Sequence, residues 1–453
     1  MKIKQFEDKN LSHYSYAILS ECESKVVLID PARDIQPYLE YSKLHHATIA
    51  AIIETHPHAD FVSGHLELHR VTGATIYCSQ LIGASYPHQA FDEGDAISFG
   101  KMQLRSLNTP GHSPDSISIV LEHGGNDIAV FTGDTLFIGD CGRPDLREKA
   151  GNVTAKREEL AGQMYRSLRE QLMKLDSEVM IYPAHGAGTL CGKALSDANY
   201  STIGEEKVSN WSLQEMTEDK FIVELTADQP FIPQYFPYDV ELNKKGAPSL
   251  KSTVAKVSIG KPIVNDTTSD QLEQNVIIID ARTSEKYKKY HLANSINLMN
   301  EGKFETWLGS IIAPGEQFYL LAQDETNLQV LINKAAKIGY EPFIKEARAI
   351  DYGPISSDVF DLDYFRKHLS DFTIIDVRNK EEHKDDPIFR DSLNLPLPEL
   401  RYRVAEIPVG KPVAVHCASG YRSAAGSSIV AGYLVGKTAV YDISDAVKEF
   451  NHS

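Results

Sequence analysis

The chain has 453 residues, of which 42% are hydrophobic, and a formal net charge of −17. A chain of this length is too long to fold around a single hydrophobic core, so we predict about three domains. The ordinary composition excludes extensive disorder. The acidic balance argues against a nucleic-acid partner, because phosphate binding requires a concentrated basic face. The sequence has no run of roughly 18 apolar residues to cross a bilayer and no apolar signal-peptide core at its start. With five scattered cysteines and no Cys-x-x-Cys pair, we expect a cytoplasmic protein with free thiols and no membrane partner.

The first segment, residues 1–250, alternates short apolar strands with polar loops. A charged helix with apolar residues at helical spacing is predicted from Ala155 to Met173. Strands that end in polar loops are typical of a layered α/β fold whose site lies on those loops. The clearest strands are predicted at 26–30, 48–53, 127–131 and 178–182.

Metal-binding side chains follow the second of these strands. His56, His58 and Asp60 stand at the spacing of a His-x-His-x-Asp-His run, which can supply ligands to two neighbouring metal ions. Here the closing position is Phe61. Because a phenyl ring cannot bind such a cation, the sequence predicts one metal rather than two.

Three further turns carry candidate ligands. They contain His112 in Thr-Pro-Gly-His-Ser-Pro, Asp134 in Phe-Thr-Gly-Asp-Thr-Leu and His185 in Tyr-Pro-Ala-His-Gly. Each polar residue follows an apolar strand or lies in a Gly/Pro turn, where several loops can converge on one ion. Four such turns within one segment therefore predict a metal site.

The rest of the chain contains an internal repeat. The run Ile-Ile-Ile-Asp-Ala-Arg at 277–282 recurs as Thr-Ile-Ile-Asp-Val-Arg at 373–378, and each copy continues with a second strand and a helix. We therefore predict two strand–helix domains, 251–352 and 353–453.

A nucleophilic loop follows the second strand of the last domain. Cys417 precedes Ala-Ser-Gly-Tyr, Arg422 and Ser423, and a helix is predicted to begin near Ser423. Main-chain N–H groups and the helix dipole at such a junction stabilise a thiolate, and Arg422 and Ser423 are expected to donate to an anion on the sulfur. Tyrosine phosphatases have five residues between Cys and Arg, but here there are four, which favours a single sulfur atom over a phosphoryl group. The earlier copy has Leu-Ala-Gln-Asp-Glu at 321–325 and no nucleophile, so we predict that it is inactive.

These motifs together carry a family resemblance. The metal motifs resemble the metallo-β-lactamase fold and its glyoxalase II-like branch, and residues 132–146 are similar to the persulfide dioxygenases. The loop at Cys417 resembles the active loop of the rhodaneses. The resemblance implies an α/β multidomain protein, with an N-terminal αββα sandwich (1–250) followed by a degenerate and an active rhodanese-like domain. It also implies one Fe(II) per chain, held by His56, His112 and Asp134.

The resemblance assigns roles to the other polar residues. His58 and Asp60 would orient the metal ligands through hydrogen bonds. Arg143 is expected to contact the substrate, and His185 is expected to contact the substrate or to support the site. Cys191 either accepts sulfur near the iron or fills the core as a small apolar residue, and both alternatives stay open.

The implied reaction is oxidation of a low-molecular-weight thiol persulfide by O2 to sulfite. Cys417, with Arg422 and Ser423, would transfer sulfur to give thiosulfate, as in sulfide detoxification. Glutathione, coenzyme A and bacillithiol-type carriers all fit, and a homo-oligomer is expected. The alternatives are a two-metal thioester hydrolase of the glyoxalase II type fused to a sulfurtransferase, and a non-catalytic persulfide sensor.

Overall fold

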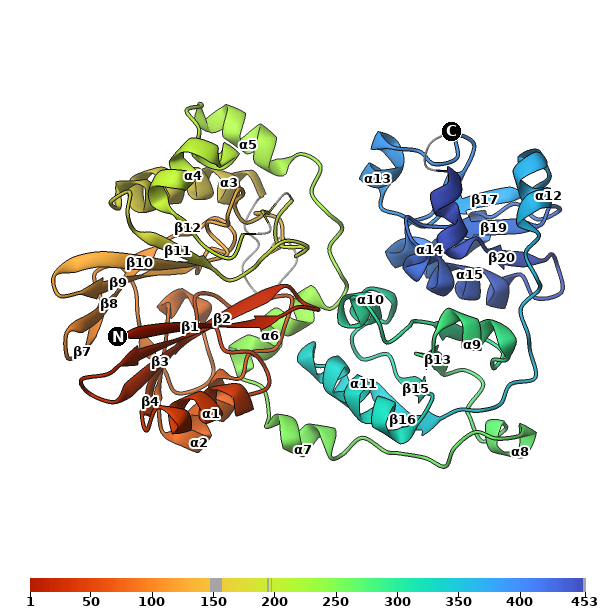
Figure 1. Cartoon of the computed structure of the whole chain (residues 1–453), viewed down its shortest axis with the longest axis horizontal. Helices are drawn as coiled ribbons and strands as arrows, with labels where there is room; N and C mark the ends of the chain where they lie inside the picture. Colours follow the sequence, from red (N-terminus) through yellow and green to blue (C-terminus); the bar gives the residue numbers. More distant parts are fainter. Residues whose placement is uncertain (147–156, 194, 197, 451–453) are drawn as a thin grey trace. The chain divides into compact units, whose positions relative to one another are not determined.

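The structure is a computed structural model of the chain, and it describes residues 1–146, 157–193, 195–196 and 198–450. The chain divides into two compact units. The first is Met1–Ser252 with Lys337–Gly339, and the second is Thr253–Ala336 with Tyr340–Ser453. Each unit has its own sheets and helices (Figure 1). Among the described helices, none has both the length and the apolar character needed to cross a membrane.

Two six-stranded sheets form the first unit. The first sheet has, in spatial order, the strands β1 (Lys2–Asp8), β2 (His13–Ser20), β3 (Lys25–Ile29), β4 (Thr48–Ile53), β5 (Thr75–Cys78) and β6 (Gln89–Ala90). The second has β12 (Ser201–Thr202), β11 (Met180–Pro183), β10 (Asn126–Gly133), β9 (Ile117–His123), β8 (Met102–Asn108) and β7 (Ala96–Phe99). The helices are α1 (Gln36–Leu44), α2 (His65–Thr72), α3 (Arg157–Arg166), α4 (Ile203–Ser209), α5 (Glu218–Thr226), α6 (Phe236–Lys245) and α7 (Leu250–Val254), the last of which crosses the boundary of the unit.

The two sheets share one core and bury their outer faces under helices. Successive side chains of a strand point to opposite faces, so Tyr16 and Ile18 of β2 pack against the second sheet while Ala17 and Leu19 pack on the side of α1 and α2. On the other side, Val130 of β10 belongs to a cluster with residues of α3 and α5. The result is an αββα sandwich, which confirms the predicted fold class.

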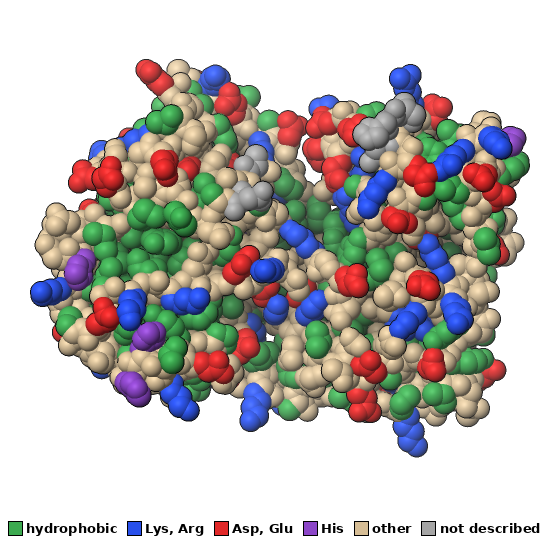
Figure 2. Space-filling view, in the orientation of Figure 1, with side chains coloured by type: hydrophobic (Ala, Val, Ile, Leu, Met, Phe, Trp, Pro, Cys, Tyr) green, Lys and Arg blue, Asp and Glu red, His purple; other side chains and the backbone are tan. Residues whose placement is uncertain are grey.

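The predicted elements of this unit match the structure closely. The four predicted strands correspond to β3, β4, β10 and β11. The predicted helix is present from Arg157 as α3 and continues in helical turns to Lys174, while Ala155 lies outside the described residues. Figure 2 shows hydrophobic side chains gathered over the strand layers at the left of the view, and acidic and basic side chains interspersed over the rest of that face. The acidic and basic side chains on this face are therefore mixed rather than separated by sign.

The second unit contains two parallel four-stranded sheets with the same strand order. The first has β14 (Ser295–Asn297), β13 (Ile277–Asp280), β15 (Phe318–Ala322) and β16 (Ile344–Ala349), with α8 (Asp266–Ser269), α9 (Ser284–Lys289), α10 (Phe304–Ile311) and α11 (Glu325–Lys337). The second has β18 (Leu393–Asn394), β17 (Thr373–Asp376), β19 (Val413–His416) and β20 (Val440–Asp442), with α12 (Leu362–Lys367), α13 (Lys380–Asp385), α14 (Leu397–Arg403) and α15 (Tyr421–Tyr433).

The register makes the two copies comparable residue by residue. Asp280 pairs with Leu321 across the first sheet, and Asp376 pairs with His416 across the second. Ala322 therefore occupies the place that Cys417 has in the last copy. The division of this unit at residues 352 and 353 stays a prediction, because both sheets belong to one compact unit.

Candidate functional site

The His-rich turn of the first unit lies at the end of β4, a central strand of its sheet. β3 and β4 run parallel, so the polar residues that follow them emerge at the same edge. His56, His58 and Asp60 are at most 5% exposed. Ionisable side chains buried to this degree require charged or hydrogen-bonding partners.

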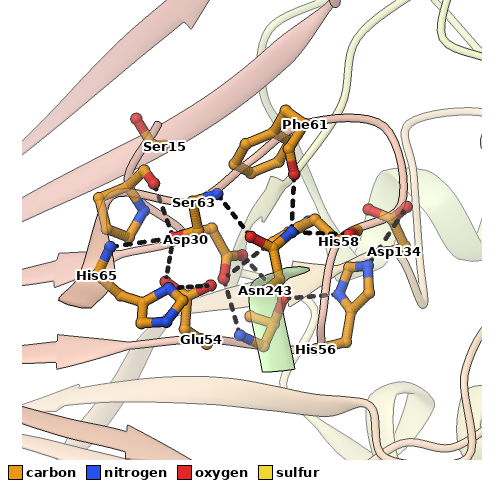
Figure 3. A network of polar contacts seen from close by, with 12 residues as sticks. Ser15, Asp30, Glu54, His56, His58, Phe61, Ser63, His65, Asp134 and Asn243 are labelled. Carbon is orange, nitrogen blue, oxygen red and sulfur yellow. Dashed lines mark hydrogen bonds and ion pairs between the residues drawn. The ribbon is translucent and has the colours of Figure 1, made fainter. Parts of the chain in front are cut away.

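Three of the predicted ligands converge. The Nε2 atoms of His56 and His112 lie 3.8 Å and 3.4 Å from Oδ2 of Asp134. One ligand atom of each residue lies within 4.8 Å of the other two. Figure 3 shows His56 turned toward Asp134. Strand ends that are far apart in the sequence thus bring two imidazoles and one carboxylate together.

This donor set fits a divalent transition metal. Among the described residues, no N–H or O–H group donates to the buried Asp134 carboxylate, and the weakly donating thiol of Cys191 interacts with it. Burial raises its pKa to about 6, which shows how poorly the protein alone solvates the charge. A bound cation would supply the missing partner, and two His with one carboxylate is the set that holds non-haem Fe(II) with open positions.

Hydrogen bonds at their Nδ1 atoms fix the ring orientations of His56 and His112. Nδ1 of His112 lies 2.9 Å from the main-chain oxygen of Arg143, and Nδ1 of His56 lies 3.0 Å from Oγ1 of Thr55. A carbonyl can only accept, so Nδ1 of His112 carries the proton and Nε2 has the free lone pair. This is the tautomer that binds a metal through Nε2.

His58, Asp60 and His185 form a second group whose ligand atoms lie within 4.8 Å of one another. Nε2 of His58 is 3.2 Å from Oδ1 of Asp30. Burial opposes the charge of His58, but Asp30, with smaller contributions from Glu54 and Asp134, outweighs burial and raises the pKa of His58 to about 9. His58 is therefore held by Asp30. Nε2 of His185 lies 3.4 Å from Oδ2 of Asp60 and 3.5 Å from Oδ1 of Asp134.

Phe61 packs directly against this second group. Its ring centroid lies 4.3 Å from that of His58 and 3.8 Å from that of His13. His13 is 1% exposed and was not singled out in the sequence, because it lies alone at the start of β2. The phenyl ring thus occupies space beside these imidazoles and contributes no ligand atom.

Arg143 and Cys191 are both buried next to the triad. The guanidinium of Arg143 makes two hydrogen bonds to Asp145, at 2.6 Å and 2.7 Å, and a third to the main-chain oxygen of Leu190. Cys191 shares a 4.8 Å group with Asp134 and His185. Burial, with the nearby Asp60 and Asp134, raises the pKa of its thiol well above the usual value. The substrate roles predicted for Arg143 and Cys191 stay predictions.

The thiol loop of the last copy connects β19 to α15. Cys417 is 1% exposed, and the main-chain N–H of Gly420 donates to its Sγ at 3.2 Å. Gly420 has φ +98°, a backbone conformation that suits glycine, and it caps α15. The helix begins at Tyr421, two residues before the predicted start at Ser423.

Arg422 and Ser423 have partners other than the sulfur. The Arg422 guanidinium binds both carboxylate oxygens of Glu382, at 2.5 Å and 2.8 Å. The Ser423 hydroxyl donates to Oδ1 of Asp442 at 2.6 Å. Both side chains therefore brace the loop in this structure, and their predicted donation to an anion on the sulfur stays a prediction. Glu382 and Asp442 were missed in the sequence, because nothing near Cys417 points to them.

The first copy, which lacks a cysteine at the position of Cys417, packs against this loop. The hydroxyl of Tyr421 donates to the main-chain oxygen of Met299 at 2.9 Å, and the Arg422 guanidinium carbon lies 5.8 Å from the centre of the Trp307 ring. The copy without a nucleophile thus supports the one that has it.

His416 gives this loop a pH dependence. Burial lowers the pKa of His416 from 6.5 to about 4, although Asp376 opposes the shift. Between these two pH values the unfolded chain binds a proton that the folded chain does not, so the free energy of unfolding falls as the pH drops from 6.5 toward 4. At about 1.4 kcal/mol per pKa unit, we expect the second unit to lose roughly 2 kcal/mol by pH 4.5.

Calorimetric unfolding of the whole chain at pH 7 and pH 4.5 measures this loss. His416→Gln, which cannot be protonated, should flatten the pH dependence of the transition of the second unit, whereas His368→Gln at an exposed position should not. Equal slopes for wild type and His416→Gln would contradict the assignment.

Comparisons with known proteins agree with the fold. The family model for the metallo-beta-lactamase superfamily matches residues 10–185, and that for the rhodanese-like domain matches residues 361–453. The mitochondrial persulfide dioxygenase ETHE1 of Bos taurus is 32% identical over 214 residues, which cover 46% of this chain and 73% of that protein. A probable hydroxyacylglutathione hydrolase of Schizosaccharomyces pombe is 34% identical over 178 residues, covering 38% of this chain and 63% of that one.

A solved structure extends the similarity beyond the first unit. The crystal structure of a metallo-beta-lactamase from Staphylococcus aureus subsp. aureus COL is 31% identical, with a TM-score of 0.67, and the match covers 77% of this chain and 98% of that one. Together with the buried triad and the Cys417 loop, these similarities identify an enzyme of sulfur metabolism. The chain belongs to the metallo-β-lactamase superfamily, within its persulfide dioxygenase family, and carries a rhodanese-like domain in its last part.

Proposed function

We propose that the chain oxidises a low-molecular-weight thiol persulfide with O2 to sulfite, and passes sulfane sulfur through Cys417 to give thiosulfate. The observation that carries the first half is the donor set of His56, His112 and Asp134, in which no described N–H or O–H group donates to the carboxylate. A single Fe(II) in this set would supply the chemistry that joins O2 to the terminal sulfur. The balance is R–S–SH + O2 + H2O → R–SH + SO3²⁻ + 2 H⁺.

The residues of the chain prepare this site in three ways. The acceptors behind His56 and His112 hold both rings with Nε2 toward Asp134. Burial excludes bulk water, which strengthens every charge interaction within the site. Asp30 holds His58 by an ion pair, so His58 lies in a fixed position beside the triad rather than within it.

The second half of the reaction takes place at Cys417. Its thiolate attacks the sulfane sulfur of a second persulfide, the S–S bond breaks, and the carrier thiol leaves. The Gly420 N–H and the N-terminus of α15 stabilise negative charge on the sulfur. Sulfite then attacks the outer sulfur of the Cys417 persulfide, which forms thiosulfate and restores the thiolate.

A thioester hydrolase of the glyoxalase II type is the second candidate. The observation in its favour is the second group, His58, Asp60 and His185, next to the triad. Against it stands Phe61, whose ring packs on that group and offers no ligand atom. We therefore propose one metal per chain and, in solution, a homo-oligomer.

Metal analysis separates the two candidates. We expect about one iron per chain by elemental analysis, held by His56, His112 and Asp134. The second group also has two imidazoles and a carboxylate, but Asp30 pairs with its His58 and Phe61 packs on the ring of His58. O2 uptake should begin on addition of a thiol persulfide, and removal of the iron by a chelator should stop it. Two zinc ions per chain with cleavage of a thioester would instead support the hydrolase, and persulfide binding without O2 uptake would support a sensor.

A further inference from the structure

Thr55 lies where three strand ends of the first unit meet. It is fully buried, at 0% exposure, between β4 and His56. Its Oγ1 lies 2.8 Å from Oδ2 of Asp30 and 3.0 Å from Nδ1 of His56. The hydroxyl therefore bridges a carboxylate and a metal-binding imidazole.

The chemistry of the three groups fixes the direction of both hydrogen bonds. Both oxygens of Asp30 accept from Thr55: Oδ1 accepts its main-chain N–H at 2.8 Å and Oδ2 accepts its hydroxyl at 2.8 Å. A hydroxyl has one proton to donate, and Oδ2 of Asp30 takes it. Oγ1 of Thr55 must then accept from Nδ1–H of His56, which leaves the lone pair of that ring on Nε2, the atom that faces Asp134.

The backbone fixes the position of Asp30, the carboxylate of this bridge. Asp30 has φ +49°, in the left-handed region that few residues other than glycine adopt, and its N–H donates to the main-chain oxygen of Ile53 at 3.0 Å. Such backbone conformations persist where the surrounding structure enforces them, often near functional sites. Figure 3 shows the Asp30 carboxylate within the polar network behind His56 and His58.

Thr55 also touches the element that carries the third ligand. A Cβ placed on Gly133 would lie 2.6 Å from Oγ1 and 2.8 Å from Cβ of Thr55, so this side chain packs directly on the backbone of Gly133. Gly133 has φ +51° and immediately precedes Asp134. One side chain thus contacts one ligand, His56, by a hydrogen bond and the neighbour of another, Gly133, by packing.

We propose that Thr55 is a positioning residue, which transmits the charge of Asp30 to His56 through its hydroxyl and sets the spacing between His56 and Asp134. This inference rests on the proposed function, because it requires a metal in the triad. The relay makes His56 a more basic ligand and prevents its ring from flipping.

Ferrous iron alone, added anaerobically to the full-length apoprotein, is the probe. Thr55→Val keeps the shape but removes the hydroxyl, and we expect it to bind Fe(II) about 10–100-fold more weakly. The electron paramagnetic resonance spectrum of its nitrosyl complex should change shape, and kcat should fall more than KM rises. Thr55→Ser restores the hydroxyl and should return the affinity and the spectrum toward wild type.

Thr132→Val is the matched control. Thr132 is equally buried, and its hydroxyl donates at 2.6 Å to the main-chain oxygen of Leu136 rather than to a ligand. It should lose stability as Thr55→Val does but keep the wild-type iron affinity and spectrum. If Thr55→Val binds iron like wild type with an unchanged spectrum, or if Thr132→Val weakens binding equally, the relay is refuted. If the wild-type protein itself binds no iron, the result refutes the proposed function, and the relay is refuted with it.

Discussion

Asp134→Ala should abolish iron binding and reduce O2 uptake by more than about 100-fold, beyond the loss expected for residues that only orient ligands. The carboxylate is the only anionic member of the triad, and Oδ2 is the atom that both imidazoles approach. Removing it leaves two neutral rings, which bind a divalent cation too weakly to retain it. Elemental analysis and an oxygen electrode measure the two losses.

The same variant tests whether the two active sites are independent. Cys417 lies in the other compact unit, so transfer of sulfur from thiosulfate to cyanide should stay measurable in Asp134→Ala. Asp127→Ala removes an aspartate from the same strand, β10, where it pairs with Arg105, and should keep both iron and O2 uptake. Equal loss of oxidation and sulfur transfer in Asp134→Ala would refute independent sites.

The layers of the first unit could be predicted because their signals are local. Apolar runs such as 48–53 mark strands regardless of what surrounds them, and the polar turns behind them mark one edge of the sheets. For this reason the turns at His56, His112, Asp134 and His185 predicted a metal site, whereas the choice of three of them, His56, His112 and Asp134, as ligands came from the family resemblance. The structure brings them together at the predicted edge.

The supporting contacts could not be predicted, because they join residues that are distant in the sequence. Asp30 reaches Thr55 and His58 only through the parallel pairing of β3 with β4, and Glu382 lies 40 positions before Arg422. The orientation of such side chains depends on packing, which has no sequence period. For the same reason the pairing of Arg422 with Glu382 could not be read from the loop motif, which predicts only that Arg422 donates to an anion on the sulfur.

Cys417→Ser should change the product of persulfide oxidation from thiosulfate to sulfite. The serine hydroxyl fits the loop and can accept the Gly420 N–H, but it cannot form a persulfide, so sulfite has no sulfur to accept. Iron content and O2 uptake should stay at wild-type levels. Ion chromatography of the products, with O2 uptake measured in parallel, separates loss of transfer from loss of oxidation.

Variants of two other cysteines, Cys22 and Cys191, test whether Cys417 is the thiol that carries the sulfur. Cys22 is exposed in the first unit, and Cys22→Ser should leave the thiosulfate yield unchanged. Cys191 is buried within the group of Asp134 and His185, and is the next thiol that could carry sulfur. If Cys417→Ser still makes thiosulfate and a second change, Cys191→Ser, abolishes it, sulfur transfer takes place beside the metal triad. If thiosulfate survives both changes, neither thiol carries the sulfur, and the coupling proposed through Cys417 is wrong.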